Sequence, residues 1–399
     1  MKLLLCSDLH LGRTPARLPE PWRRPARTIR AWEALVECAI REKVNAVILG
    51  GDLVDAENGF WEALAPLETG ARTLGDAGIR VIAVAGNHDA VVLPRLAAFL
   101  PSDVFTLLGA RGQWEALVLK ENDAPALRLY GWSFPRPHWD GDPLDDFSPA
   151  PPDGLPALGI VHGDLGASSS RHAPLSLARL QAQPVTAWLL GHLHAPRLHE
   201  GSPWVLMPGS PQPLDPSETG AHHAWITELQ NGALTPPRPA ATASLRYETL
   251  EIPLRADIPP GEDTIRKAIL RQLEGFDCDR TVLRLRFTGE TSDPAFLAAC
   301  IRHLTEWEPG GNTIIEKIEN RTRPPFDPAA CRQLGGLHAL LADLIEQGPP
   351  DGLRQRLGDL HARILRQGEF DGKGLAPLPL PDPRPHAERL LAEILEGAP

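Results

Sequence analysis

The chain has 399 residues, 42% of them apolar and 23% charged, which fits two or three globular domains. Its net charge of -11 argues against a free-standing DNA-wrapping protein, so any contact with nucleic acid must be local or shared with a partner. Scattered cysteines, a very short N-terminal apolar run and the lack of any ~18-residue apolar stretch predict a reduced, cytoplasmic protein with no membrane span.

The first half of the chain alternates short apolar runs with amphipathic stretches. Some runs are strand-like because they are short, rich in bulky or β-branched residues, and stopped by glycine or a polar cluster. These runs are Lys2–Leu5, Ala46–Leu49, Val81–Ala85, Leu158–Val161 and Trp188–Leu190. A helical pattern between the first two places on one face Ile29, Trp32, Leu35, Ala39 and Ile40. This alternation predicts an α/β layered core over residues 1–234.

The second half reads differently, starting with a proline-rich linker expected at 235–245. Residues 246–325 show a β-α-β-α-β order, which predicts a small α+β module. Its expected elements are Tyr247–Leu254, Thr264–Leu273, Thr281–Thr288, Pro294–Thr305 and Thr313–Ile318. Residues 326–399 are expected to form a helical tail with an extended proline-rich stretch at 377–385.

Five polar motifs carry the chemistry, and each directly follows one of the strand-like runs. The motifs are Asp8-Leu9-His10, Gly51-Asp52, Gly86-Asn87-His88-Asp89, His162-Gly163-Asp164 and Gly191-His192-Leu193-His194. Loops at the carboxyl ends of strands in an open α/β sheet converge on one crevice, so these side chains should meet there. Any one motif could be an ordinary turn, but chance does not readily place all five in this order.

The residue types in these motifs favour a pair of divalent cations. Carboxylate, imidazole and amide oxygen suit Mn, Fe or Zn better than Ca or Mg. Two cations ~3.5–4 Å apart could share a bridging carboxylate and a bridging hydroxide that attacks phosphorus in line. Asp52 is the candidate bridge, and His88 could protonate the leaving oxygen or stabilise charge on the phosphoryl group. The sequence therefore predicts a two-metal phosphoesterase.

The segments SDLHLG, GGDLVD, GNHD, VHGD and GHLH, in that order, resemble the signature of calcineurin-like metallophosphoesterases. The resemblance implies a four-layer α/β sandwich core and two divalent cations, with Mn2+ the first choice and Fe or Zn the alternatives. One metal ion would be held by Asp8, His10, Asp52 and His194. The second would be held by Asp52, Asn87, His162 and His192. His88 would be the catalytic histidine.

Softer motifs resemble the SbcD-type nuclease branch and its YhaO-like group. They are SDLHLGR at 7–13, GDLVD at 51–55, MPGSPQ at 207–212, PSETGAHHAW at 216–225 and VLRLRFTGET at 282–291. This resemblance implies a nuclease that cleaves DNA in repair or end processing, with an SbcC-like coiled-coil ATPase as partner and a homodimer as a further possibility. Residues 246–325 would then be a capping domain. The tail at 326–399 would either dock the ATPase or pack on the protein's own core.

An arginine-rich segment follows the first motif and could bind DNA. Its arginines are Arg13, Arg17, Arg23, Arg24, Arg27 and Arg30, with Glu20 the only acidic residue between Gly12 and Ala31. Arginines beside a phosphodiester-cleaving centre would bind backbone phosphates, although a solvated surface loop is an equally good interpretation. Prolines at 15, 19, 21 and 25 predict that its first part is not helical.

Two other functions remain open from the sequence. The same centre could act on a cyclic nucleotide, a nucleotide-sugar lipid or a phosphoprotein, which the acidic net charge favours slightly. A scaffold subunit without chemistry is the non-enzyme alternative, and the intact ligand set with His88 argues against it.

Overall fold

The computed structural model describes residues 1–55, 59–150, 153–167, 169–256, 261–276, 278–310, 312–334, 339 and 342–343. The chain divides into two compact units, which are described separately. The first comprises Met1–Leu250, Arg266–Leu285 and Leu304–Ile318. The second comprises Glu251–Ile265, Arg286–His303 and Glu319–Pro399. The domain boundaries expected after residues 234, 245 and 325 stay predictions.

The first unit contains a seven-stranded sheet with the order β14-β13-β1-β2-β3-β4, in which β15 also pairs with β13. The strands are β1 (Lys2–Cys6), β2 (Ala46–Leu49), β3 (Arg80–Ala83), β4 (Phe105–Leu107), β13 (His223–Gln230), β14 (Ala233–Leu234) and β15 (Arg238–Ala241). Strands β1 to β4 are parallel, so their carboxyl ends lie along the same edge. Strand β13 runs antiparallel beside β1, with Leu4 opposite Ile226.

A second, six-stranded sheet has the order β11-β12-β10-β7-β6-β5. Its strands are β5 (Glu115–Glu121), β6 (Ala124–Trp132), β7 (Ala157–His162), β10 (Ala187–Gly191), β11 (Arg197–His199) and β12 (Trp204–Met207). The four inner strands are parallel, and the two edge strands, β5 and β11, are antiparallel to their neighbours. The two short strands β8 (Asp164–Leu165) and β9 (Pro174–Leu175) pair with each other beyond β7.

The two sheets pack face to face on a shared apolar core. Leu3 and Leu5 of β1 lie in the same buried cluster as Ile160 of β7 and Leu189 of β10. Leu4, between them in sequence, belongs to the cluster on the opposite face of the first sheet, as the alternation of side chains along a strand requires. The first sheet is therefore buried on both faces, which explains why its strands read as continuous apolar runs.

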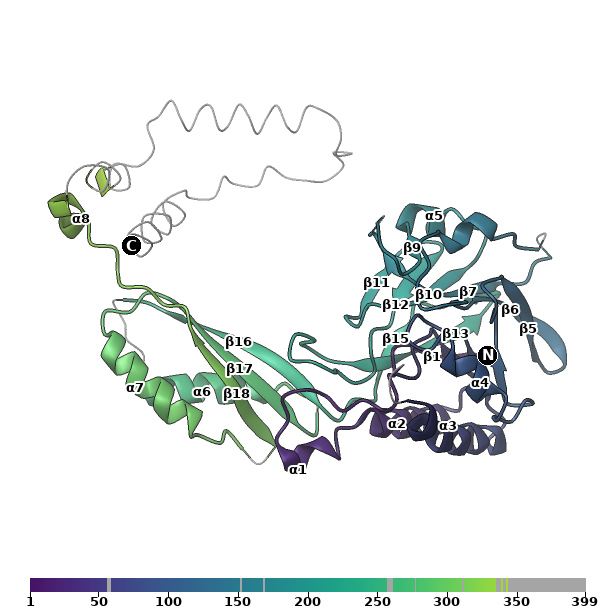
Figure 1. Ribbon diagram of the computed structural model, residues 1–399, viewed down its shortest axis with the longest axis horizontal. Coiled ribbons are helices and arrows are strands. Elements are labelled where there is room, and N and C mark those ends of the chain that lie inside the picture. Colours follow the sequence, from purple (N-terminus) through teal and green to yellow (C-terminus); the bar gives the residue numbers. More distant parts are fainter. Residues whose placement is uncertain are drawn as a thin grey trace. The chain divides into compact units, whose positions relative to one another are not determined.

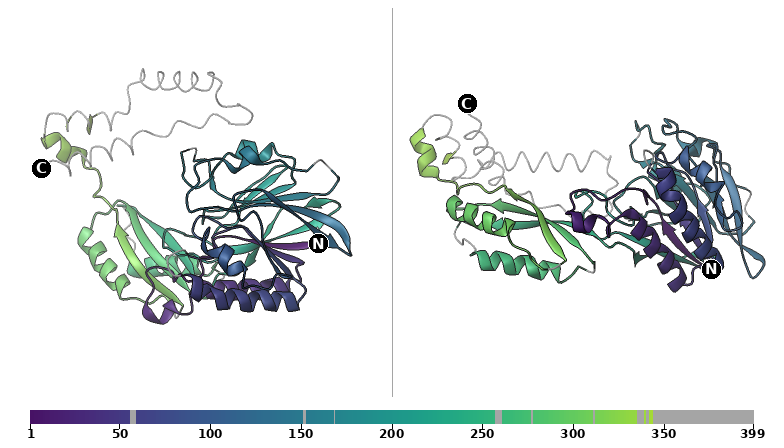
Figure 2. Two further views of the ribbon diagram at one scale, coloured as in Figure 1. Left: turned by 45° about the vertical axis from the view of Figure 1, so that its right-hand side comes forward. Right: turned by 60° about the horizontal axis from the view of Figure 1, so that its bottom comes forward.

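Helices complete the outer layers (Figures 1 and 2). Helix α2 (Thr28–Arg41) and helix α3 (Gly59–Asp76) run along the outer face of the first sheet, where Leu35 and Leu67 are fully buried. Helix α5 (Leu177–Gln181) lies on the outer face of the second sheet and buries Leu180 there. Short helices occur at Glu20–Arg23 (α1), Val92–Ala97 (α4) and Pro143–Asp146, the last a 3-10 helix. This helix–sheet–sheet–helix order confirms the predicted α/β sandwich.

The structure corrects three expectations in this unit. Ile40, placed on the apolar face of α2, is 38% exposed, and the buried face is centred on Trp32 and Leu35 instead. Residues 238–241, expected within the linker, form strand β15, which tolerates Pro239 because it is an edge strand. Helix α1 begins within the proline-containing arginine segment, and Pro21 fits there because the first turn needs no amide hydrogen.

The predicted β-α-β-α-β module is confirmed as a three-stranded sheet with the order β16-β17-β18. Its elements are β16 (Arg246–Leu254), α6 (Glu262–Leu273), β17 (Thr281–Gly289), α7 (Pro294–Thr305) and β18 (Thr313–Asn320). Charged side chains on this sheet pair with one another: Arg284 Nε lies 2.8 Å from Glu316 Oε2, and Arg286 contacts Glu251 and Glu319 at 2.7 and 3.1 Å. These arginines are therefore largely neutralised within the protein.

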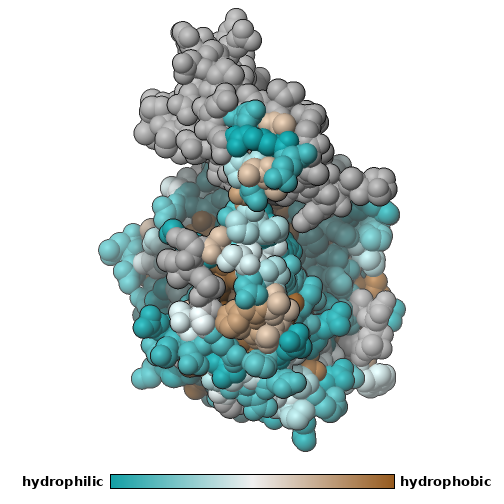
Figure 3. Space-filling view, turned by 90° about the vertical axis from the view of Figure 1, so that its left-hand side faces the viewer, coloured by the Kyte–Doolittle hydropathy of each residue, from teal (hydrophilic) through white to brown (hydrophobic). Residues whose placement is uncertain are grey.

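Helix α8 (Pro328–Leu334) is the last described helix. Most of the tail expected over residues 326–399, including the proline-rich stretch at 377–385, lies outside the described residues. Figure 3, viewed from the side of α6 and α7 in Figure 1, shows hydrophilic residues around a small apolar area. None of the described helices is both long enough and apolar enough to cross a membrane.

Candidate metal centre

The five predicted motifs follow strands of two different sheets. Strands β1, β2 and β3 of the first sheet lead into the motifs at residues 8, 52 and 87. Strands β7 and β10 of the second sheet lead into those at residues 162 and 192. The expected crevice therefore lies where the carboxyl ends of two packed sheets meet, and not at the edge of one sheet.

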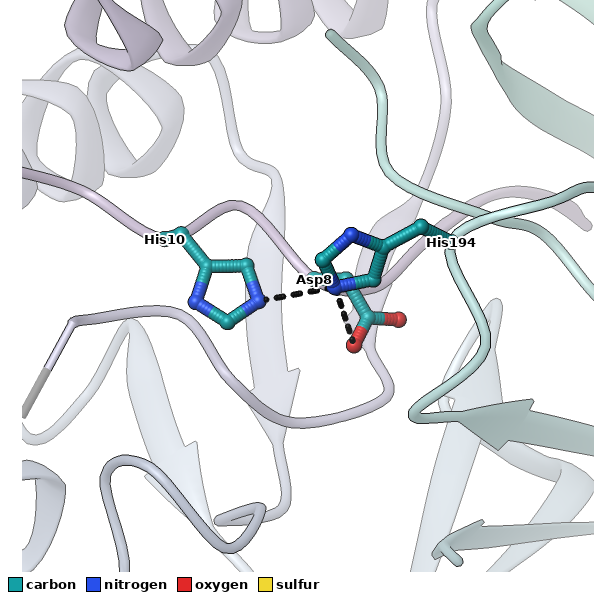
Figure 4. A group of neighbouring side chains, drawn as sticks. All are labelled: Asp8, His10 and His194. Atoms are coloured by element: carbon teal, nitrogen blue, oxygen red, sulfur yellow. Dashed lines mark hydrogen bonds and ion pairs between the residues drawn. The ribbon is translucent and has the colours of Figure 1, made fainter. Parts of the chain in front are cut away.

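One group of ligands consists of Asp8, His10 and His194, whose donor atoms all lie within 4.8 Å of one another (Figure 4). Nε2 of His10 lies 3.1 Å from Nε2 of His194, which is 4.0 Å from Oδ1 of Asp8. Asp8 and His10 are fully buried, while 24% of the His194 side chain is exposed. The ring nitrogens thus face a carboxylate across a space open to solvent on the His194 side.

The second group is built around Asp52 and His162. Nε2 of His162 lies 3.3 Å from Asp52 Oδ2 and 3.1 Å from the side-chain oxygen of Asn87. The same Asn87 oxygen lies 3.2 Å from Nδ1 of His192. Asp52 Oδ2 is also 3.9 Å from Nε2 of His10 in the first group. All seven predicted ligands are therefore brought together, with Asp52 between the two groups; their role as ligands stays a prediction.

The backbone at four of these residues adopts a conformation that side chains usually avoid. The φ angles are 54° at Asp8, 44° at His10, 51° at Asp52 and 105° at His192. A non-glycine residue held there costs on the order of 1–3 kcal/mol, and such residues gather at functional sites. The backbone thus adopts unfavourable φ angles at four of the candidate ligands, and this conformation directs their side chains toward one another.

Two glycines allow this close approach. A Cβ at Gly51 would lie 2.6 Å from Nδ1 of His162, and one at Gly86 would lie 2.2 Å from Oδ1 of Asp52. Neither distance leaves room for a side chain. The GGD and GNHD motifs therefore need their glycines so that Asp52 and His162 can meet.

The residues fit a pair of divalent cations. Asp8 and Asp52 are buried, and their ion-pair partners among the described residues are histidines and not lysine or arginine. Burial lowers the pKa of His10 to about 3 and that of His192 to about 4, so both rings are neutral near pH 7 and offer lone pairs. Despite burial, the nearby Asp52 raises the pKa of His162 to about 9, so a bound cation would have to displace that proton. Carboxylates, imidazoles and an amide oxygen match the donor set of Mn, Fe or Zn sites.

His88 lies beside the first group but points toward another partner. Its Nδ1 is 3.3 Å from Oδ1 of Asp55, and its ring meets that of His10 edge-on at 4.9 Å. The hydrogen bond to Asp55 raises the pKa of His88, whose side chain is 40% exposed. His88 can therefore carry a proton at the mouth of the site. Asp55, His88 and His10 are also close enough together to hold a cation.

Asp89 braces two of the ligand loops. Its buried carboxylate accepts hydrogen bonds from the backbone amides of Gly86 at 2.7 Å, Leu53 at 2.7 Å and Val54 at 3.3 Å. Burial, together with the nearby Asp52, raises the pKa of Asp89 to about 7. Asp55 and Asp89 both stand within motifs that the sequence had singled out, but their partners only become visible in the fold.

Two histidines outside the motifs, His138 and His172, form a row of rings that reaches the candidate ligand His192. The His172 ring is 5.2 Å from that of His192 and 5.6 Å from that of His138. Asp164 begins β8 and receives no side-chain hydrogen bond in the described structure. The structure thus places His172 against a predicted ligand, as a neighbour rather than a donor.

The arginine segment is less free than its sequence indicates. Arg13, Arg23, Arg27 and Arg30 have acidic partners, namely Asp55 at 3.6 Å, Glu20 at 3.1 Å, Glu62 at 3.4 Å and Glu33 at 2.5 Å. Asp55, Glu62 and Glu33, which lie outside the segment in sequence, therefore neutralise its arginines in addition to Glu20. Arg17 and Arg24 are exposed and have no ion-pair partner among the described residues. Ion pairs at the surface contribute little energy, so the paired arginines can still exchange partners.

The chain is similar to a family of phosphoesterases and to several known proteins. Residues 1–196 match the family model described as calcineurin-like phosphoesterase, which includes every predicted ligand. The chain is 27% identical over 238 residues to the "Uncharacterized metallophosphoesterase YhaO" of Bacillus subtilis, covering 57% of each chain, so it spans little more than half of that relative. It is 26% identical over 371 residues to the "DNA double-strand break repair protein Mre11" of Halobacterium salinarum, covering 90% of this chain and 85% of that one. A shorter match to the Mre11 of Aeropyrum pernix is 36% identical over 88 residues, covering 22% and 21%.

Proposed function

Residues 1–196 belong to the calcineurin-like phosphoesterase family, and from that premise we propose that this metal-dependent hydrolase is a DNA nuclease of the SbcD/YhaO type. It would cleave phosphodiester bonds in DNA repair or end processing. The observation that carries the proposal is the position of Asp52, whose carboxylate lies between two ligand groups, with His88 beside them.

The described residues divide the work of holding two cations. Asp8, His10 and His194 would hold one ion, and Asn87, His162 and His192 would hold the other, with Asp52 shared. When bound, two such ions supply an activated water nucleophile and neutralise the charge of the phosphate ester. Mn2+ is the proposed metal, because the mixed nitrogen and oxygen donors suit it, with Fe or Zn as alternatives.

His88 supplies the proton that the leaving oxygen needs. Asp55 accepts a hydrogen bond from Nδ1 of His88, so the ring is oriented with Nε2 free for the substrate. Arg13 in turn lies 3.6 Å from the same carboxylate of Asp55. A protonated imidazole held in this way can act as general acid, a contribution of typically 100-fold to 10,000-fold in rate.

Two observations support DNA as the substrate. The Mre11 relatives are named for the repair of DNA double-strand breaks. The exposed arginines Arg17 and Arg24 follow the ligand motif of Asp8 and His10 closely in sequence, so they could bind phosphates along a DNA strand. Arg13, Arg23 and Arg27 would join them by exchanging their acidic partners for phosphate.

The alternative is the same chemistry on a cyclic nucleotide, a nucleotide-sugar lipid or a phosphoprotein. The net charge of -11 and the paired arginines of the β16-β17-β18 sheet favour this alternative, because neither attracts a polyanion. Partners remain proposals as well: an SbcC-like ATPase docking on residues 326–399, and a possible homodimer. We also propose a cytoplasmic location.

A substrate panel tests the proposed function. The purified full chain with added Mn2+ should degrade linear double-stranded or single-stranded DNA and leave cyclic AMP and a phosphopeptide intact. The Asp52→Asn variant, measured in parallel, identifies any contaminating nuclease. Hydrolysis of cyclic AMP or the phosphopeptide without cleavage of DNA would reject the nuclease and support a phosphoesterase that acts on another substrate.

A further inference from the structure

His194 is held by an acidic side chain that none of the five ligand motifs contains. Its Nδ1 lies 2.8 Å from Oε1 of Glu218, and only 15% of the Glu218 side chain is exposed. We propose that Glu218 is a positioning residue, which fixes the tautomer and orientation of His194 so that Nε2 faces the metal centre. This inference rests on the proposed two-metal function and adds a residue to it.

The tautomer follows from the chemistry of the two groups. An ionised carboxylate can only accept hydrogen bonds, so Nδ1 of His194 must carry the hydrogen and donate it to Glu218. Nε2 is then the nitrogen with the free lone pair. That atom lies 3.1 Å from Nε2 of His10 and 4.0 Å from Oδ1 of Asp8, on the side where the first cation is proposed (Figure 4). A hydrogen bond to the far nitrogen of a metal-binding histidine also raises its basicity toward the metal.

Glu218 is itself held in one orientation. Its other oxygen, Oε2, accepts from the backbone amide of Leu214 at 2.8 Å and lies 3.3 Å from Oγ of Ser210. Ser210 is fully buried and contacts Nδ1 of His222 through both its hydroxyl, at 3.1 Å, and its carbonyl oxygen, at 2.7 Å. Both carboxylate oxygens therefore have partners, which hold the side chain in this orientation.

The segment that carries Glu218 is fastened by backbone hydrogen bonds on three sides. The amide of Ser210 donates to the carbonyl of His194 at 3.1 Å, and the amide of Ala16 donates to that of Leu214 at 2.8 Å. The amide of Gly220 donates to the carbonyl of Tyr247, in strand β16, at 3.0 Å. The segment thus ties a predicted metal ligand to the arginine segment and to the first residues of β16.

A purely structural role for Glu218 makes a different prediction. If the carboxylate only braced its own segment, any loss of that bracing would have the same effect as loss of Glu218. Ser210→Ala provides this comparison, because it removes the contact with Oε2 and leaves the bond from His194 to Oε1 in place. Glu200→Gln is the control for charge, because Glu200 is exposed and lies outside the site.

The experiment is a calorimetric titration of the metal-depleted full chain with Mn2+, repeated with Co2+ while the visible spectrum is recorded. The wild-type chain should bind two ions. Glu218→Gln should lose about 10-fold to 100-fold in affinity at one position, with an altered Co2+ spectrum, and keep the other. Glu218→Asp, which retains the charge, should recover part of the affinity. Glu200→Gln should resemble the wild type, and Ser210→Ala should weaken binding much less than Glu218→Gln does, because it leaves the bond between His194 and Oε1 in place.

Thermal unfolding of the metal-free variants checks that they fold, and Glu218→Asp takes the place of Glu218→Gln if the latter does not. The proposal is overturned if Glu218→Gln binds both ions with unchanged affinity and spectrum, or if Ser210→Ala weakens binding as much. A wild-type chain that binds no metal would instead overturn the proposed two-metal function itself.

Discussion

Asp52 is the residue on which both ligand groups depend, because its Oδ2 approaches His10 at 3.9 Å and His162 at 3.3 Å. Asp52→Asn removes the shared negative charge with almost no change in volume. We expect this variant to lose tight binding at both metal positions and all phosphodiesterase activity. Metal analysis of the dialysed protein measures the first effect. Retention of two tightly bound ions per chain would contradict the bridging role.

His88 allows a change that separates proton transfer from metal binding. His88→Ala should reduce turnover by roughly 100-fold to 10,000-fold, because the general acid is lost. Both metals should stay bound, because His88 is not one of the seven predicted ligands. Asp55→Asn should reduce turnover less, since it weakens the orientation of His88 and leaves the ring in place. Steady-state rates and metal content are measured on the same samples. Unchanged turnover in His88→Ala would rule out its proposed role.

The sequence predicted the ligand set but not what holds the ligands. Asp8, Asp52 and His192 could be predicted because each follows directly after an apolar strand, which is a local pattern in the sequence. Glu218 could not be assigned in this way, since two strands, β11 and β12, separate it in sequence from its partner His194. Asp55 belongs to the GDLVD motif at 51–55, but its contact with His88 depends on the packing of two loops.

At the scale of elements, the arginine segment makes a prediction about substrate. The double variant Arg17→Glu and Arg24→Glu should weaken DNA cleavage while sparing hydrolysis of a small aryl phosphodiester. DNA binding should also depend less on salt, with the slope reduced by about one for each phosphate that is no longer bound. Arg72→Glu, on helix α3, is the matched control. Equal loss on both substrates, or no loss on DNA, would reject a DNA-binding segment.

The paired arginines Arg23 and Arg27 refine this design. Their partners Glu20 and Glu62 reduce the net charge they present, so reversing them should affect DNA cleavage less than reversing Arg17 and Arg24.

Inner strands could be predicted from the sequence more readily than edge strands. The inner strands β1, β2, β3, β7 and β10 were predicted because burial on both faces makes them apolar throughout. Edge strands such as β5 mix Glu115, Lys120 and apolar residues, and β15 contains Pro239, so both resemble loops in sequence. The β16-β17-β18 module was predicted in full because its strands and helices alternate at regular intervals.

For the whole molecule, the proposal that residues 326–399 dock an ATPase partner can be tested by deleting them. Removing residues 326–399 should abolish co-purification with an SbcC-like ATPase while leaving hydrolysis of the aryl phosphodiester intact, because every predicted ligand precedes residue 197. Copurification of tagged full-length and truncated chains with the ATPase measures the first effect. An undiminished yield of the ATPase with the truncated chain would show that the tail is not its docking element.

The strained backbone at Asp8, His10, Asp52 and His192 has a consequence for stability. Each position would be easier to fold as glycine, which adopts positive φ freely, so selection for stability alone would remove these side chains. Their presence in this chain means that folding and metal binding favour different residues at the same four positions. Bound cations would reconcile the two by stabilising the folded state alone, so the thermal stability of this chain should be a sensitive record of its metal content.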